Sequence, residues 1–188
     1  MPSNKRMAKF KLRIPENDLA RWAEGYSYPR ESEIVDGVAP AARARGYLTR
    51  DEFLRLCRWK TARSQSRCAA NEDEFVQEVT RVAFSTAHEQ LKIGVLRLLK
   101  GVSWPTASVI LHFCDRGKYP ILDYRALWSL SAVPPSQCSF PFWWAYTDFM
   151  RQLQERTGLS MRLLDRALWQ YSKERQQIKP AHAQGSRR

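Results

Sequence analysis

The chain of 188 residues is 44% apolar and 27% charged, which is typical of a globular protein long enough to bury a core. It holds no run of about 18 apolar residues that could span a membrane, and its basic start lacks the apolar segment of a secretory signal. A net charge of +12 favours a polyanionic partner. We therefore expect a cytoplasmic protein, nucleoid-associated if its source is bacterial.

The positive charge is concentrated between residues 43 and 67, a segment that contains eight basic residues and only two acidic ones. The two termini are also basic. One such run fits a solvated surface as well as a binding site, but three basic segments with little acid between them favour nucleic acid. We expect a nucleic acid as the partner, and a monomer.

The four cysteines indicate neither a metal site nor an oxidising compartment. Cys57, Cys68, Cys114 and Cys138 are spaced too irregularly for a zinc or iron–sulfur motif. We expect reduced, mostly buried thiols. The three histidines share no helical face, so we predict no metal and no cofactor.

Helical periodicity dominates the chain and alternating strand patterns are almost absent, so the sequence predicts an all-α fold. A first helix is expected over residues 17–24, where apolar residues recur at helical spacing until Gly25. A weaker helix is expected over residues 31–46, interrupted around Gly37 and Pro40.

Capping patterns mark the next helices. Thr49 and Glu52 form a capping box. Asn71 and Glu74 have the same spacing and are expected to cap a second apolar helix in the same way. The helix over residues 87–100 is apolar around most of its circumference, which predicts burial. Two further helices are expected after residue 140, the first of them rich in aromatic residues.

A helix-hairpin-helix is predicted over residues 91–113. Gly101 permits the sharp turn, Ser103 can cap the following helix, and Pro105 fits its first turn. Such a turn points backbone N–H groups outward at the positive end of a helix, which suits a phosphate. Contacts of this kind position a duplex without reading its sequence.

Asp123 opens the helical stretch "YRALWSL", where the helix dipole stabilises an ionised carboxylate. The preceding helix is about 15 Å long, and its connection can reach roughly 30 Å, so Asp123 can return beside the hairpin. An aspartate at a helix start is most often only a cap.

The segment Leu98–Leu130 resembles the helix-hairpin-helix (HhH-GPD) DNA glycosylases. Leu99–Ser103 stands at the family's hairpin, Thr106-Ala107 follows at the expected offset, and Pro120–Asp123 ends in the expected aspartate. The resemblance implies a two-lobed helical bundle, with Asp123 as the catalytic carboxylate that supports release of a base flipped out of duplex DNA. The resemblance thus implies double-stranded DNA as the partner, and the base would be damaged, mismatched or modified.

Two departures from the family pattern bear on activity. Ser103 replaces the second hairpin glycine, which bears on phosphate binding. Pro105 stands where the strand-cleaving branch carries a lysine, and proline has no amine to form a Schiff base. The resemblance therefore implies a monofunctional glycosylase without lyase activity and without an iron–sulfur cluster.

The alternatives are a non-catalytic DNA-binding protein in which Asp123 is only a cap, and an enzyme acting on an unusual base in foreign DNA.

The candidate site residues fall into two further groups. Those expected to bind DNA are Lys100, Gly101, Val102, Ser103, Trp104 and Thr106 from the hairpin, with Arg58, Lys60 and Arg63 from the basic segment. Those expected to line the base pocket or to intercalate are Trp59, Tyr124 and Trp128; the first of these is the best placed to fill the gap left by an extruded base.

The expected organisation has four parts. They are a basic arm and helix that packs with the C-terminal lobe (residues 1–28), a helical lobe holding the hairpin and Asp123 (29–131), C-terminal helices (132–175) and a flexible basic tail (176–188).

Overall fold

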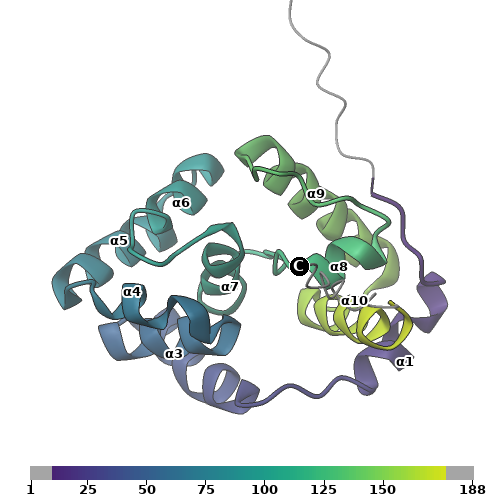
Figure 1. Ribbon diagram of the computed structural model, residues 1–188, viewed down its shortest axis with the longest axis horizontal. Helices are drawn as coiled ribbons and strands as arrows, with labels where there is room; N and C mark the ends of the chain where they lie inside the picture. The colour runs from purple at the N-terminus through teal and green to yellow at the C-terminus, as the bar shows by residue number, and fades with distance from the viewer. Residues whose placement is uncertain (1–9, 177–188) are drawn as a thin grey trace, which may run out of the picture.

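The computed structural model describes residues 10–176, and every regular element in that range is helical, as predicted (Figure 1). The basic arm before residue 10 and the tail from residue 177 lie outside the described residues. The α-helices are α1 (Leu19–Glu24), α2 (Ala39–Arg45), α3 (Arg50–Lys60), α4 (Gln65–Ala69), α5 (Asp73–Ser85), α6 (Glu89–Leu96), α7 (Trp104–Cys114), α8 (Tyr124–Ser129), α9 (Phe140–Thr157) and α10 (Met161–Arg175).

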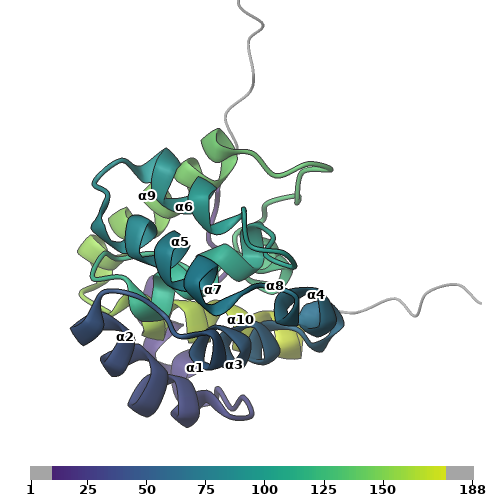
Figure 2. The same cartoon turned by 90° about the vertical axis from the view of Figure 1, so that its left-hand side faces the viewer.

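The helices form two lobes (Figure 1). The first contains α2 to α7, with α7 packed against α2, α3 and α6 at its centre, as Figure 2 shows from that side. The second contains α1, α8, α9 and α10, in which α10 packs against α1, α8 and α9. Residues from both ends of the described chain therefore build one lobe. No described helix is both long and apolar enough to cross a membrane.

Local signals set several helix ends as predicted. Thr49 and Glu52 form the capping box of α3, with the Glu52 carboxylate accepting from the Thr49 N–H at 2.9 Å. Asp123 caps α8 by accepting from the Arg125 N–H at 2.9 Å.

Three of the four thiols are buried, and the fourth is half-buried; all four are free.

Other expectations about the helices were wrong. The backbone stays helical through Gly37 and Pro40, because a wider, π-type turn over Glu33–Val38 runs directly into α2 and the proline sits in the first turn of that helix. The sequence offers the hydroxyl of Ser85 or Thr86 as the cap of α6, but the His88 imidazole caps the helix by accepting from the Leu91 N–H.

The helix α6 is not buried on most of its surface. Leu91 is 49% exposed, and Leu98, just beyond its end, is 64% exposed. Only one side of the helix is covered, by α5 and α7, so an apolar sequence overstates its burial.

Asn71 is not the cap of α5. Its amide instead bridges to the hairpin 29 residues away. Its Oδ1 accepts from the Lys100 N–H at 2.8 Å, and its Nδ2 donates to the Lys100 carbonyl at 2.9 Å and to the Cys68 carbonyl at 2.8 Å. Asn71 is buried, and its amide satisfies backbone groups of the hairpin and of α4 that lie partly or fully away from water.

Candidate functional site

The hairpin turn depends on glycine at position 101. Gly101 has φ +83°, and a Cβ there would lie 2.6 Å from Cys68 Sγ and 2.9 Å from the Cys68 amide nitrogen. Neither the conformation nor the space admits a side chain without strain. The turn is therefore pressed against α4, and Asn71 holds it there.

The helix that follows the turn begins where predicted, but without the predicted capping bond. Ser103 is the N-cap residue of α7 and Pro105 lies in its first turn. The Ser103 hydroxyl makes no capping bond, contrary to expectation. This hydroxyl and the positive end of an 11-residue helix thus face outward together.

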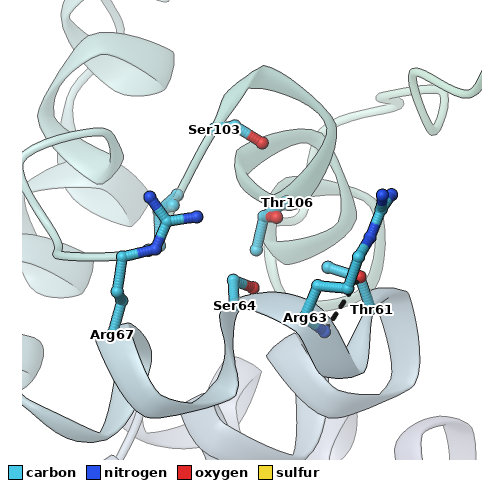
Figure 3. Close-up of a pocket in the computed structure, with 8 residues that line it drawn as sticks. Thr61, Arg63, Ser64, Arg67, Ser103 and Thr106 are labelled. Carbon is cyan, nitrogen blue, oxygen red and sulfur yellow. Dashed lines mark hydrogen bonds between the residues drawn. The ribbon is translucent and has the colours of Figure 1, made fainter.

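A cavity of about 390 Å³ opens at this helix start (Figure 3). Its lining residues are Thr61, Arg63, Ser64, Arg67, Gly101, Val102, Ser103 and Thr106. Figure 3 shows Arg67 and Arg63 on opposite sides of the hydroxyls of Ser64, Ser103 and Thr106. We name this the hairpin cavity.

The two arginines of the hairpin cavity are available to a ligand. Within residues 10–176 no carboxylate forms an ion pair with Arg63 or Arg67. Two guanidinium groups, hydroxyls and a helix N-terminus together form a set of donors for a phosphate. Arg67 was missed as a site residue, although it belongs to the same basic segment as Arg63.

A second cavity contains Asp123. One carboxylate oxygen, Oδ1, caps α8, and the other, Oδ2, lies 2.6 Å from the Lys60 Nζ. The side chains of Lys60 and Asp123 are only 13% and 17% exposed. Lys60 was expected to contact phosphate, but it lies inside this cavity, in an ion pair with Asp123.

Half of the residues that line the second cavity are aromatic, and the lining residues come from both lobes. Its volume is about 40 Å³, and it is lined by Tyr26, Tyr28, Trp59, Lys60, Ile121, Asp123, Asp165 and Trp169. Trp59 packs against Tyr28 and Phe113, with ring centroids 5.1 Å apart in each pair. Trp59 is therefore a wall of the cavity, held by its neighbours. We name this the aromatic cavity.

Asp165 is a second carboxylate in the aromatic cavity and was missed by the sequence analysis. Burial raises its pKa to about 6, even though the neighbouring Arg162 opposes that rise and donates a hydrogen bond to it. Arg162 also bonds to Glu31 at 3.1 Å and to the Tyr26 hydroxyl at 3.0 Å. The sequence carries no local signal for Asp165, which lies within the amphipathic pattern of α10.

The remaining aromatic candidates lie elsewhere. Tyr124 is exposed on α8, next to Asp123 but not among the cavity's lining residues. Trp128 packs against Tyr171, with Arg13 over its ring at 4.6 Å. Trp104 is half-buried at the start of α7, with Arg97 over its ring at 4.3 Å. The structure does not bring Trp128 or Trp104 to the aromatic cavity.

The remaining basic candidates flank the two cavities. Arg58 is exposed and lines a neighbouring cavity of about 480 Å³, which also reaches Tyr28 and Trp59. Lys100 is exposed, and its Nζ donates to the Ala70 carbonyl at 3.3 Å, outside the hairpin cavity. Among residues 10–176, no group of three or more His, Cys, Asp or Glu side chains is arranged to hold a metal ion.

Consecutive residues line the two cavities. Lys60, the last residue of α3, lines the aromatic cavity, and Thr61, which follows the helix in an extended conformation, lines the hairpin cavity. Adjacent Cα atoms are about 3.8 Å apart, so the end of α3 positions one lining residue of each cavity.

Comparison with known proteins adds little to this geometry. No model of a known protein family matches the sequence, and no curated protein does. Among solved structures, the chain is similar to the Methanocaldococcus jannaschii 8-oxoguanine glycosylase/lyase in complex with a 15mer DNA containing 8-oxoguanine. The identity is 18%, over 87% of this chain and 82% of that chain, with a TM-score of 0.44. At this score the likeness assigns neither fold nor activity.

Proposed function

We propose that this protein is a DNA glycosylase that hydrolyses the N-glycosidic bond of a damaged, mismatched or modified base flipped out of duplex DNA. The observation that carries the proposal is the position of Asp123, a largely buried carboxylate in an aromatic cavity beside the hairpin cavity. The net charge of +12 supports DNA as the partner.

The hairpin cavity would hold the DNA backbone. Arg63 and Arg67 would pair with a phosphate, and the N-terminus of α7 would add its dipole and N–H groups. Ser103 stands where the family has a glycine, but its hydroxyl makes no capping bond to α7 and can itself donate to a phosphate. These contacts carry no sequence information, so selectivity would come from the flipped base.

The aromatic cavity would receive the base. At about 40 Å³ it is smaller than a nucleobase, so its walls must part on binding. Tyr26 and Tyr28 are the aromatic walls best placed to move, because both lie outside the helices, in the segment that follows α1. Aromatic faces stack on a base and exclude water from the bond that breaks.

Asp123 would act on the sugar. As the base departs, positive charge develops at C1′ and O4′, and an ionised carboxylate within a poorly solvated cavity stabilises it. The same carboxylate can orient water for attack on C1′. Pro105 stands where the strand-cleaving branch of the family carries its lysine, so the hairpin motif by itself supports base hydrolysis only.

The test is base release from duplexes carrying uracil, 8-oxoguanine, alkylated purines or mismatches. The Asp123→Asn variant keeps an oxygen to cap α8 but loses the negative charge, so we expect base release to fall at least 100-fold, in line with the loss of one electrostatic group. DNA affinity should stay within a few-fold. Asp148→Asn, on the exposed surface of α9, is the matched control.

The second candidate function is DNA binding without catalysis. The observation that favours it is that both oxygens of Asp123 already have structural partners, the Arg125 N–H and the Lys60 ammonium. If wild type and Asp123→Asn release no base from any of these duplexes and bind DNA equally well, this second function replaces the first.

A further inference from the structure

Lys60 is the one amine of the described chain that faces Asp123 within the aromatic cavity. Asp123 uses Oδ1 to cap α8, which leaves Oδ2 for the amine at 2.6 Å. The pair joins the end of α3 to the start of α8, across 63 residues of sequence. The hairpin position where the strand-cleaving branch carries its lysine is Pro105, so the amine beside Asp123 comes from another element.

A second lysine–aspartate pair shows what a structural pair looks like in this protein. The Lys92 Nζ donates to Asp115 at 2.8 Å and to the Ala83 carbonyl at 2.9 Å, and it lies 5.9 Å from the centre of the Tyr119 ring. Its ammonium is surrounded by partners, and it lines none of the cavities described above.

The Lys60 ammonium has fewer protein partners than the Lys92 ammonium. Among the described residues its only hydrogen-bond partner is Asp123, although an ammonium has three N–H donors. The side chain is 13% exposed and lines the cavity, so a ligand that enters the cavity comes close to the amine. An amine beside a carboxylate that can take up its proton is the arrangement of a nucleophile with its general base.

We propose that Lys60 is a catalytic nucleophile that attacks C1′ of the flipped nucleotide and gives this protein a strand-cleaving lyase activity. The proposal rests on the proposed function, since it uses the same cavity and the same carboxylate. It differs in the fate of C1′, which bonds to nitrogen rather than to a water oxygen. It also places the amine at the end of α3, outside the hairpin motif.

The reaction balances with the groups present. Asp123 takes one proton from the Lys60 ammonium, and the freed lone pair forms the N–C1′ bond as the N-glycosidic bond breaks. The base leaves with the bonding electrons and receives a second ammonium proton. The C1′–O4′ bond then opens to give a protonated imine, and O4′ receives the proton held by Asp123.

Strand cleavage follows from the imine. Water removes a proton from C2′, and the C3′–O bond breaks so that the 3′-phosphate leaves with its electron pair. Hydrolysis of the imine by water restores the amine. No oxidant, reductant or metal enters these steps. Lys60 supplies the nucleophile, and Asp123 shuttles one proton.

The test uses the full-length protein and a duplex carrying a single abasic site, which needs no knowledge of the target base. An amine and the abasic aldehyde form an imine that borohydride reduces to a stable cross-link. We expect wild type to be trapped, with peptide mapping placing the adduct on Lys60. Lys60→Arg keeps a cation beside Asp123 but has no nucleophilic amine, so trapping and strand cleavage should fall at least 100-fold. Lys11→Arg, at an exposed position, is the matched control.

The outcomes separate this inference from the proposed function. Absence of a cross-link in wild type, equal trapping of Lys60→Arg, or an adduct on another amine overturns the inference. Base release that depends on Asp123 without any cross-link overturns it too, and leaves the hydrolytic glycosylase standing. Lys60-dependent trapping with no base released from any duplex supports the amine's role and overturns the glycosylase.

Discussion

A substitution at the hairpin glycine tests whether the turn is specified by conformation alone or also by its close approach to α4. Gly101→Ala places a methyl group in a left-handed backbone conformation, at φ +83°, and 2.6 Å from Cys68 Sγ. Gly46 has nearly the same φ, +86°, but a Cβ there meets nothing within 4 Å. Gly46→Ala is therefore a control that carries the conformational strain without the collision.

The expected magnitudes differ accordingly. The left-handed conformation costs an alanine about 1–2 kcal/mol, and both variants bear that cost. Overpacking against Cys68 adds about 1–3 kcal/mol, and only Gly101→Ala bears it. The gain from a less flexible unfolded chain is common to both and cancels.

Urea denaturation of the two variants and wild type measures this difference. We expect Gly101→Ala to lower the free energy of unfolding by about 2 kcal/mol more than Gly46→Ala does. We also expect Gly101→Ala to weaken DNA binding at least tenfold, because the turn must move away from α4. Equal destabilisation by the two variants would refute the packing argument.

Three further predictions concern the two cavities and the hydrogen bonds from Asn71 to the hairpin. Removing Arg63 and Arg67 together should make the slope of log affinity for DNA against log salt shallower by about 2, whereas Arg156→Ala, on α9, should leave the slope unchanged; a salt titration of binding measures both. Asn71→Ala leaves buried backbone groups of the hairpin unpaired and should lower the free energy of unfolding by about 2–3 kcal/mol, as read from denaturation curves. Because burial raises the pKa of Asp165 to about 6 in the folded state, against about 4 when unfolded, its contribution to stability is fully present below pH 4 and is lost as the pH rises through 6. The wild-type free energy of unfolding minus that of Asp165→Asn should therefore fall by about 2 kcal/mol between pH 4 and pH 7.

The parts of the fold that the sequence predicted are those fixed by neighbouring residues. The α3 capping box joins residues three apart, and the cap of α8 joins Asp123 to a backbone N–H two residues on. Gly101 and Pro105 set the hairpin through their own backbone preferences. Such signals operate over one turn of chain, so a single sequence suffices to find them.

Contacts between distant residues were out of reach. Asn71 has the residue type and position of a helix cap, yet its amide bonds to the hairpin 29 residues away, because there it satisfies two buried backbone groups. Asp165 belongs to α10, which packs into the second lobe, and only the meeting of the lobes brings it to the aromatic cavity. One sequence contains no record of such pairings.

Lys60 shows how this limit affects an inference about chemistry. The absence of a lysine at position 105 predicts the absence of an amine only if the amine must come from the motif. A reacting carbon responds to distance and not to position in the chain, and the amine of Lys60 is 2.6 Å from the carboxylate that the motif supplies. The end of α3 can therefore supply the amine that the hairpin lacks at position 105, provided that α3 and α8 keep their relative positions. Packing of α3 against α7 helps to fix those positions, because the hairpin precedes α7 and the connection to Asp123 follows it.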